Sequence, residues 1–116
     1  MADERFLIVR LGSLGDIIHA APAAAMLRGS FRGAPIDWLV DPRWTGLFAG
    51  CSDIREVIPI NFGSARSIAA TVRRMRSARY TCALDFQGLY KSALLAYLSG
   101  PEAAKVYVAT GMVPGK

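Results

Sequence analysis

Residues 6–19 read FLIVRLGSLGDIIH, and this stretch decides the expected fold. Its first four residues are all apolar, which is typical of a strand buried on both faces of a parallel sheet. A loop with two glycines follows at residues 11–15, and Asp16 then stands where we expect a helix to begin. A strand, a glycine-containing loop and a helix N-terminus together indicate a ligand site at the carboxyl edge of an open α/β sheet.

The rest of the chain alternates between short apolar runs and helical segments. Pro22 predicts either a helical turn followed by a second helix or one kinked helix. Further strands are expected at residues 36–40, 57–60, 82–86 and 105–108, and helices at residues 42–48, after the capping residue Ser64, and at residues 89–98. This alternation predicts an α/β fold, a Rossmann-like parallel sheet flanked by helices. We expect one domain over residues 1–109 and a disordered tail over residues 110–116.

Composition and charge narrow the class of protein. Of the 116 residues 53% are apolar, which is enough to fill one core. The net charge of +5 favours anionic partners such as nucleic acid, acidic lipid headgroups or phosphorylated sugars. We find neither a secretory signal nor a run of about 20 apolar residues that would span a bilayer. The sequence therefore predicts a cytoplasmic protein, whose two cysteines, Cys51 and Cys82, stay free thiols.

Two motifs that suggest cofactors are rejected on spacing. The two glycines of residues 12–15 lack the middle glycine of a dinucleotide fingerprint, and residues 88–92 lack the glycines of a phosphate-binding Walker loop. His19 is the single histidine, which excludes a multi-histidine metal site. No cofactor and no metal are expected.

The loop and the first helical turn hold the first candidate site residues. From position alone, Asp16 is interpreted as a helix cap, and a general base is the alternative. Ser13 and the N–H groups of Leu14 and Gly15 have the chemistry to bind a phosphate or a sugar hydroxyl, or they form a plain turn. His19 lies one turn beyond Asp16, and a structural role or acceptor binding are both open to it.

A second group of candidates lies at the end of the fourth expected strand. Asp85 and Gln87 end that strand, and a helix follows, so an acid, an amide and an amine reach the same sheet edge as Asp16. The amine is Lys91, whose alternative is a solvated helix residue. Five arginines between residues 66 and 79 are interpreted mostly as a solvated face.

These residues also carry a family resemblance. Residues 9–23, VRLGSLGDIIHAAPA, resemble the N-terminal signature of the lipopolysaccharide heptosyltransferases of glycosyltransferase family 9. Three later stretches fit the same family in its order and at about its spacing: IDWLVD at residues 36–41, VIPI at 57–60 and DFQGLYKSA at 85–93. The resemblance spans residues 6–100, and four motifs in sequence are far more specific than one.

The resemblance implies a function and a set of site residues. It implies the acceptor-side, N-terminal half of a GT-B glycosyltransferase that inverts the sugar it transfers. The donor would be ADP-heptose, bound mainly by an absent C-terminal half, and the acceptor an anionic lipopolysaccharide core carrying 3-deoxy-octulosonic acid. Asp16 matches the proposed catalytic base of the family. The substrate-binding residues implied are Ser13, Leu14, Gly15, His19, Gln87, Gly88, Lys91, Ser92 and Arg66.

The chain also departs from the family pattern. Residues 61–66 read NFGSAR where the family often carries a Trp-Arg-rich segment, which leaves the acceptor sugar open. We expect the chain to be inactive alone and to contact the cytoplasmic face of the inner membrane peripherally. The alternatives are a non-catalytic Rossmann-like fragment or an anion-binding module. A nucleic-acid binder is not expected, because aromatic residues are not interleaved among the arginines.

Overall fold

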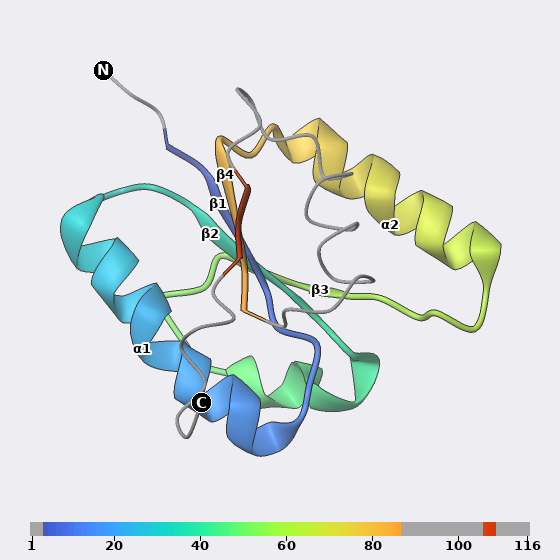
Figure 1. Cartoon of the computed structure of the whole chain (residues 1–116). Coiled ribbons are helices and arrows are strands. Elements are labelled where there is room, and N and C mark those ends of the chain that lie inside the picture. The colour runs from blue at the N-terminus through green and yellow to red at the C-terminus, as the bar shows by residue number, and fades with distance from the viewer. Residues whose placement is uncertain (1–3, 87–105, 109–116) are drawn as a thin grey trace.

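A five-stranded parallel sheet forms the centre of the computed structural model, which describes residues 4–86 and 106–108 (Figure 1). Its strands lie in the order β3-β2-β1-β4-β5 and every neighbouring pair is parallel. The strands are β1 (Phe6–Val9), β2 (Ile36–Val40), β3 (Glu56–Pro59), β4 (Cys82–Asp85) and β5 (Val106–Val108). This is the order of a doubly wound nucleotide-binding sheet, and it confirms the predicted Rossmann-like fold.

The strand order reverses between β1 and β4, and the register aligns the ends of the three central strands. Val9 lies opposite Leu39 of β2 on one side and opposite Asp85 of β4 on the other. Just beyond the strands, the Phe86 N–H donates to the carbonyl of Val9 at 3.0 Å. The segments that follow β1, β2 and β4 therefore leave the sheet at one edge, where such folds bind ligands.

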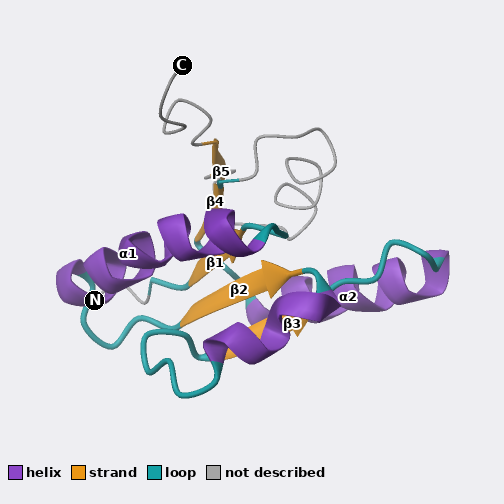
Figure 2. Cartoon of the chain, turned by 90° about the horizontal axis from the view of Figure 1, so that it is seen from below, coloured by secondary structure: helices purple, strands orange, loops and turns teal. Residues whose placement is uncertain are grey.

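One face of the sheet is covered by α1 (Leu14–Ser30) and by the short 3-10 helix η1 (Pro42–Phe48), as Figure 2 shows. The small side chains of α1 allow a close approach to the sheet. The buried cluster on this face includes Ile17, Ala20 and Ala24 of α1 together with Phe6, Ile8, Ile36, Trp38 and Val40 of the strands.

The opposite face is covered by α2 (Ala65–Ala78). Ser64 caps this helix as predicted, because its Oγ accepts a hydrogen bond from the Ser67 N–H at 3.2 Å. Met75 is fully buried under the helix, whereas Ile68 and Val72, the other two members of the predicted apolar stripe, are only partly buried. The predicted arrangement of helices on both faces is therefore confirmed.

The main local difference from prediction is at α1. The helix begins at Leu14, two residues before Asp16, and it runs without interruption through Pro22. The alanines around Pro22 are strong helix formers, which favours one long helix over two short ones. The expected strand boundaries shift by one residue at β3, β4 and β5. The predicted helix at residues 89–98 and the predicted tail lie outside the described residues.

Two further findings bear on the sequence predictions. Cys51 is exposed and Cys82 is buried, and neither forms a disulfide, as predicted. Within the described part of the chain, no helix combines the length and apolar character that crossing a membrane requires.

Candidate functional site

The first turn of α1 presents the Asp16 carboxylate at the carboxyl edge of the sheet. Ser13, not Asp16, occupies the N-cap position, and Asp16 is the third helical residue. The Ser13 N–H donates to Oδ2 of Asp16 at 3.4 Å and the Ser13 hydroxyl lies 3.3 Å from the same oxygen. The predicted capping role of Asp16 is thus corrected: its carboxylate folds back onto the cap residue, as in a capping box.

Arg10, the residue directly after β1, holds the same carboxylate oxygen. Its Nη2 lies 2.9 Å from Oδ2 of Asp16, and its Nη1 donates to the carbonyl of Phe86 after β4. The Arg10 side chain is 13% exposed, whereas that of Asp16 is 51% exposed. The pair therefore joins an enclosed cation to an anion that solvent can reach.

The surroundings of Asp16 keep it ionised. Partial burial acts to raise the pKa of its carboxyl, but the hydrogen bond from the Ser13 N–H and the charge of Arg10 outweigh this and leave the pKa below its usual value. The N-terminus of α1 adds a favourable dipole. At neutral pH this carboxylate is an acceptor of protons and hydrogen bonds and has no proton to donate.

Two tryptophans contact the loop that follows β1. The Trp38 indole N–H donates to the carbonyl of Arg10 at 3.1 Å. Trp44 of η1 packs so closely on Gly12 that a Cβ there would lie 3.1 Å from its indole nitrogen. A side chain at Gly12 would therefore displace Trp44 or the loop. The absence of a Cβ at Gly12 permits this close approach.

A second ion pair borders the site from the end of β2. Oδ1 of Asp41 accepts hydrogen bonds from the Arg43 N–H at 2.9 Å and from Arg43 Nε at 3.2 Å. The backbone hydrogen bond from Arg43 is the main reason that the pKa of Asp41 is lowered. Because the Arg43 side chain is 76% exposed, this pair presents its charges to solvent.

The structure brings only part of the predicted site set together. Ser13, Leu14, Gly15 and Asp16 cluster at the start of α1, all exposed, and His19 is exposed one turn further along. Arg66 is exposed in the first turn of α2, after the edge strand β3, so two strand positions separate it from β1. The remaining predicted residues, Gln87, Gly88, Lys91 and Ser92, lie outside the described residues.

Two residues at this site were missed by sequence reasoning. Arg10 was part of the quoted motif but was assigned no role, although a cation directly after a buried strand at a ligand-binding edge is a usable signal. Trp44 gave no such signal, because its contact with Gly12 depends on how η1 packs against the loop. Asp85 is completely buried at the end of β4, which suits a supporting role better than contact with a substrate.

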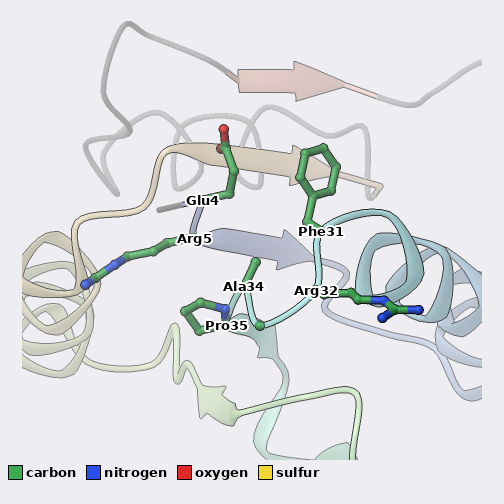
Figure 3. Close-up of a pocket in the computed structure, with 7 residues that line it drawn as sticks. Glu4, Arg5, Phe31, Arg32, Ala34 and Pro35 are labelled. Atoms are coloured by element: carbon green, nitrogen blue, oxygen red, sulfur yellow. The ribbon is translucent and has the colours of Figure 1, made fainter. Parts of the chain in front are cut away.

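A separate hollow of about 380 Å³ lies at the opposite, amino edge of the sheet. It is lined by Glu4, Arg5, Phe31, Arg32, Gly33, Ala34 and Pro35. Figure 3 shows the side chains of Arg5 and Arg32 pointing away from each other, and Arg5 donates to the carbonyl of Ala78 at 3.0 Å. The two cations therefore do not converge on one anion. We place the functional site at the carboxyl edge for this reason and because of the fold.

No group of three or more His, Cys, Asp or Glu side chains suited to a metal ion occurs among the residues that the structure describes. Among the described residues, the carboxyl edge presents a carboxylate, a guanidinium and the N–H groups of a helix start.

The sequence is similar to known enzymes of lipopolysaccharide synthesis. No family model matches the chain. Over 101 residues it is 31% identical to lipopolysaccharide heptosyltransferase 1 of Salmonella typhimurium, which covers 78% of this chain and 32% of the relative. The Pseudomonas aeruginosa protein of the same name is 32% identical, with 78% of this chain and 28% of the relative covered. The chain thus spans about a third of the length of these relatives.

Solved structures agree with this similarity. The E. coli heptosyltransferase WaaC with ADP is 31% identical, with a TM-score of 0.69 over 78% of this chain and 30% of that one. A glycosyl transferase family 9 structure from Veillonella parvula has a TM-score of 0.79 over 88% of this chain and 31% of that one, and at 17% identity it shows the fold. The resemblance to the lipopolysaccharide heptosyltransferases is confirmed.

Proposed function

Because this chain resembles the lipopolysaccharide heptosyltransferases over most of its length, we propose that it is the acceptor-side domain of a heptosyltransferase-like glycosyltransferase. The enzyme transfers heptose from ADP-heptose to the inner core of lipopolysaccharide, and its architecture is GT-B. The relatives support the donor, since E. coli WaaC is known with ADP and with ADP-2-deoxy-2-fluoro heptose. The net charge of +5 suits an anionic acceptor.

The observation that carries the proposal is the state of the Asp16 carboxylate. Its Oδ2 is held by Ser13 and Arg10, and within the described residues its Oδ1 has no hydrogen-bond donor. The side chain is half exposed at the edge where a doubly wound sheet binds its ligands. A fixed carboxylate with one open oxygen is the arrangement that a general base requires.

In this proposal the reaction is a single inverting transfer. The acceptor hydroxyl attacks the anomeric carbon of the heptose, a new C–O bond forms on the face opposite the leaving group, and the bond to ADP breaks. Asp16 takes the hydroxyl proton on Oδ1 as the attack proceeds. Because its pKa is lowered, Asp16 is a weak base, so proton transfer must accompany bond formation.

Other residues of the loop bind and orient the acceptor in this proposal. Ser13, Leu14 and Gly15 supply polar groups beside Asp16, and His19 lies one turn away along α1. Arg10 donates to the carbonyl of Phe86, the last described residue after β4. Gln87, Gly88, Lys91 and Ser92 remain predictions, as does Arg66.

The proposal assigns no turnover to this chain alone. The chain spans about a third of its relatives, and we assign the ADP-binding groups to a further half. Holding both substrates in one geometry contributes roughly 7–11 kcal/mol in well-oriented systems. The chain incubated with ADP-heptose and a truncated lipopolysaccharide acceptor should release no ADP above background, and robust release would contradict this division. The cytoplasmic location and peripheral contact with the inner membrane are part of the same proposal.

The experiment that tests the function is the Asp16→Asn substitution in a form of the protein that includes a donor-binding half. Asparagine keeps the size of the side chain and removes the base, so turnover should fall by roughly 10²–10⁴-fold with a small change in acceptor affinity. Asp53→Asn, in the loop that leads into β3 at the amino edge, is the matched control and should keep normal turnover. Near-normal turnover of Asp16→Asn would reduce Asp16 to a helix-stabilising residue.

A further inference from the structure

Two hydrogen bonds to its main chain hold Arg10 in place, independently of its side-chain contacts. Its N–H donates to the carbonyl of Leu39 at 3.3 Å, and its own carbonyl accepts the Trp38 indole N–H at 3.1 Å. Both partners belong to β2, so the position of Arg10 at the end of β1 is fixed on the neighbouring strand. The direction of its side chain is correspondingly restricted.

The guanidinium group then connects two different loops. One terminal nitrogen pairs with Oδ2 of Asp16 in α1, and the other donates to the carbonyl of Phe86 after β4. These are the two segments on either side of the point where the strand order reverses. The flat guanidinium carries donors at fixed angles and can serve both acceptors at once, whereas the single ammonium of lysine is a point charge.

The contact has a direct consequence for the carboxylate. Arg10 and Ser13 both engage Oδ2 of Asp16, which restricts rotation of the carboxylate, and Oδ1 has no hydrogen-bond donor among the described residues. Since even the usual carboxyl pKa leaves an aspartate ionised at neutral pH, Arg10 is not needed to remove the proton of Asp16. What the arginine adds is orientation.

The structure describes other charged groups at this edge, and none of them is shown in contact with Asp16 among the described residues. Asp41 and Arg43 pair with each other, and Asp85 is buried at the end of β4. His19 is exposed on α1, three residues beyond Asp16. Among the described residues, Arg10 is the cation that contacts Asp16.

We propose that Arg10 is a positioning residue: it fixes the Asp16 carboxylate relative to the end of β4, so that one oxygen is always presented to the acceptor hydroxyl. This inference rests on the proposed function, in which Asp16 is the base. It adds the group that orients the base and couples it to the segment beginning at Gln87.

The test compares Arg10→Gln and Arg10→Lys with the unchanged chain, and Arg43→Gln is the matched control at the same edge. In this chain alone, the Asp16 carboxyl is titrated by carbon NMR. The midpoint should move to higher pH in Arg10→Gln, stay low in Arg10→Lys, which keeps the charge, and be unaffected by Arg43→Gln. The carbonyl-carbon signal of Phe86 should move in both Arg10 variants, because the hydrogen bond from the guanidinium to that carbonyl is lost.

Turnover is then measured in the form that includes a donor-binding half. Arg10→Gln should lower it on the order of 10²-fold, the effect of a small misplacement of a reacting group. Arg10→Lys should fall between Arg10→Gln and the unchanged protein. The acid limb of the pH profile should move to higher pH in Arg10→Gln, together with the Asp16 titration, while Arg43→Gln keeps both turnover and profile.

The two proposals fail in different ways. An Asp16 titration that is unchanged in Arg10→Gln, or a pH profile that does not move with it, would overturn the positioning role whatever the turnover. Near-normal turnover of Asp16→Asn would instead overturn the proposed function. The Asp16 titration in this chain does not depend on catalysis, so the two failures can be told apart. Denaturant unfolding of each variant shows whether lost turnover comes from lost folding.

Discussion

The Asp37–Arg55 pair at the amino edge and the Asp16–Arg10 pair at the carboxyl edge differ in how many carboxylate oxygens are engaged. At the amino edge, Asp37 is 1% exposed, and Arg55 contacts both of its oxygens, at 3.0 and 2.6 Å. The buried Tyr80 hydroxyl also donates to Asp37, at 2.7 Å. At the carboxyl edge, Asp16 is 51% exposed and only one of its oxygens is engaged within the described residues.

The difference shows how one type of ion pair serves two purposes. The Asp37 cluster joins β2, the segment before β3 and the segment before β4, and its hydrogen bonds leave no open oxygen for a ligand. A bidentate pair on a buried carboxylate fixes structure. The Asp16 pair engages one oxygen within the described residues and its side chain is half exposed, which stabilises the fold less and suits the base of the proposed function.

Stability should therefore depend on Asp37 far more than on Asp16. Asp37→Ala removes the acceptor of Arg55 and of the Tyr80 hydroxyl, and leaves that hydroxyl buried without this partner. We expect the free energy of unfolding to fall by about 3 kcal/mol, the low end for a broken buried pair because Arg55 is half exposed. Denaturant unfolding measures it. A loss no larger than that of Asp16→Ala would contradict the contrast between the two edges.

Alkaline pH should lower the free energy of unfolding, because Tyr80 belongs to the same cluster. Burial, the hydrogen bond to Asp37 and the charge of Asp37 together raise the pKa of Tyr80 above its usual value of 10.0. The unfolded chain loses this proton near pH 10 and the native chain keeps it. The contribution of Tyr80 to the free energy of unfolding is therefore fully present below that pH. Above it, this contribution falls by up to about 1.4 kcal/mol per pH unit.

The control for this prediction is Tyr80→Phe, which lacks the titrating group. Its unfolding free energy should be lower at neutral pH by about 1 kcal/mol for the lost hydrogen bond. Above pH 10 it should decline less steeply than that of the unchanged chain. Parallel curves for the two proteins would mean that Tyr80 ionises as easily in the native state as in the unfolded one.

The smallest effect on stability is expected at the carboxyl edge. Asp16→Asn retains a side-chain oxygen that can accept from the Ser13 N–H, and the lost ion pair with Arg10 is half exposed. We expect a change in unfolding free energy below about 1 kcal/mol. Thermal and denaturant unfolding check it, and a loss as large as that of Asp37→Ala would make Asp16 a structural residue like its counterpart.

Much of the fold followed from the sequence because its signals are local. The apolar run of residues 6–9, the capping Ser64 and the proline at residue 42 each set the start or identity of an element without help from distant residues. The start of α1 was misplaced because two residues compete for the cap. Ser13 is the N-cap residue, and the Asp16 carboxylate accepts a hydrogen bond from the Ser13 N–H. When Asp16 is considered alone, this reciprocal pattern resembles that of a capping aspartate.

The site was less predictable because its contacts join distant segments. Asp16 could be singled out from its place in the motif, but its pairing with Arg10 and the link to Phe86, 76 residues away from Arg10, depend on the register of three strands. Asp37 did offer a signal. A charged residue inside the apolar run IDWLV requires a buried partner, although its partners, Arg55 and Tyr80, come from segments that the sequence does not connect.

The central claim is that the acceptor binds at the carboxyl edge, and an NMR titration of this chain tests it without a donor half. A truncated lipopolysaccharide acceptor carrying 3-deoxy-octulosonic acid is added to the nitrogen-labelled chain. We predict that the amide signals of Ser13 and Gly15 and the indole signal of Trp44 move with acceptor concentration, while the amide of Gly33 at the amino-edge hollow stays fixed. Movement of Gly33 with unchanged signals at Ser13 and Gly15 would contradict the account.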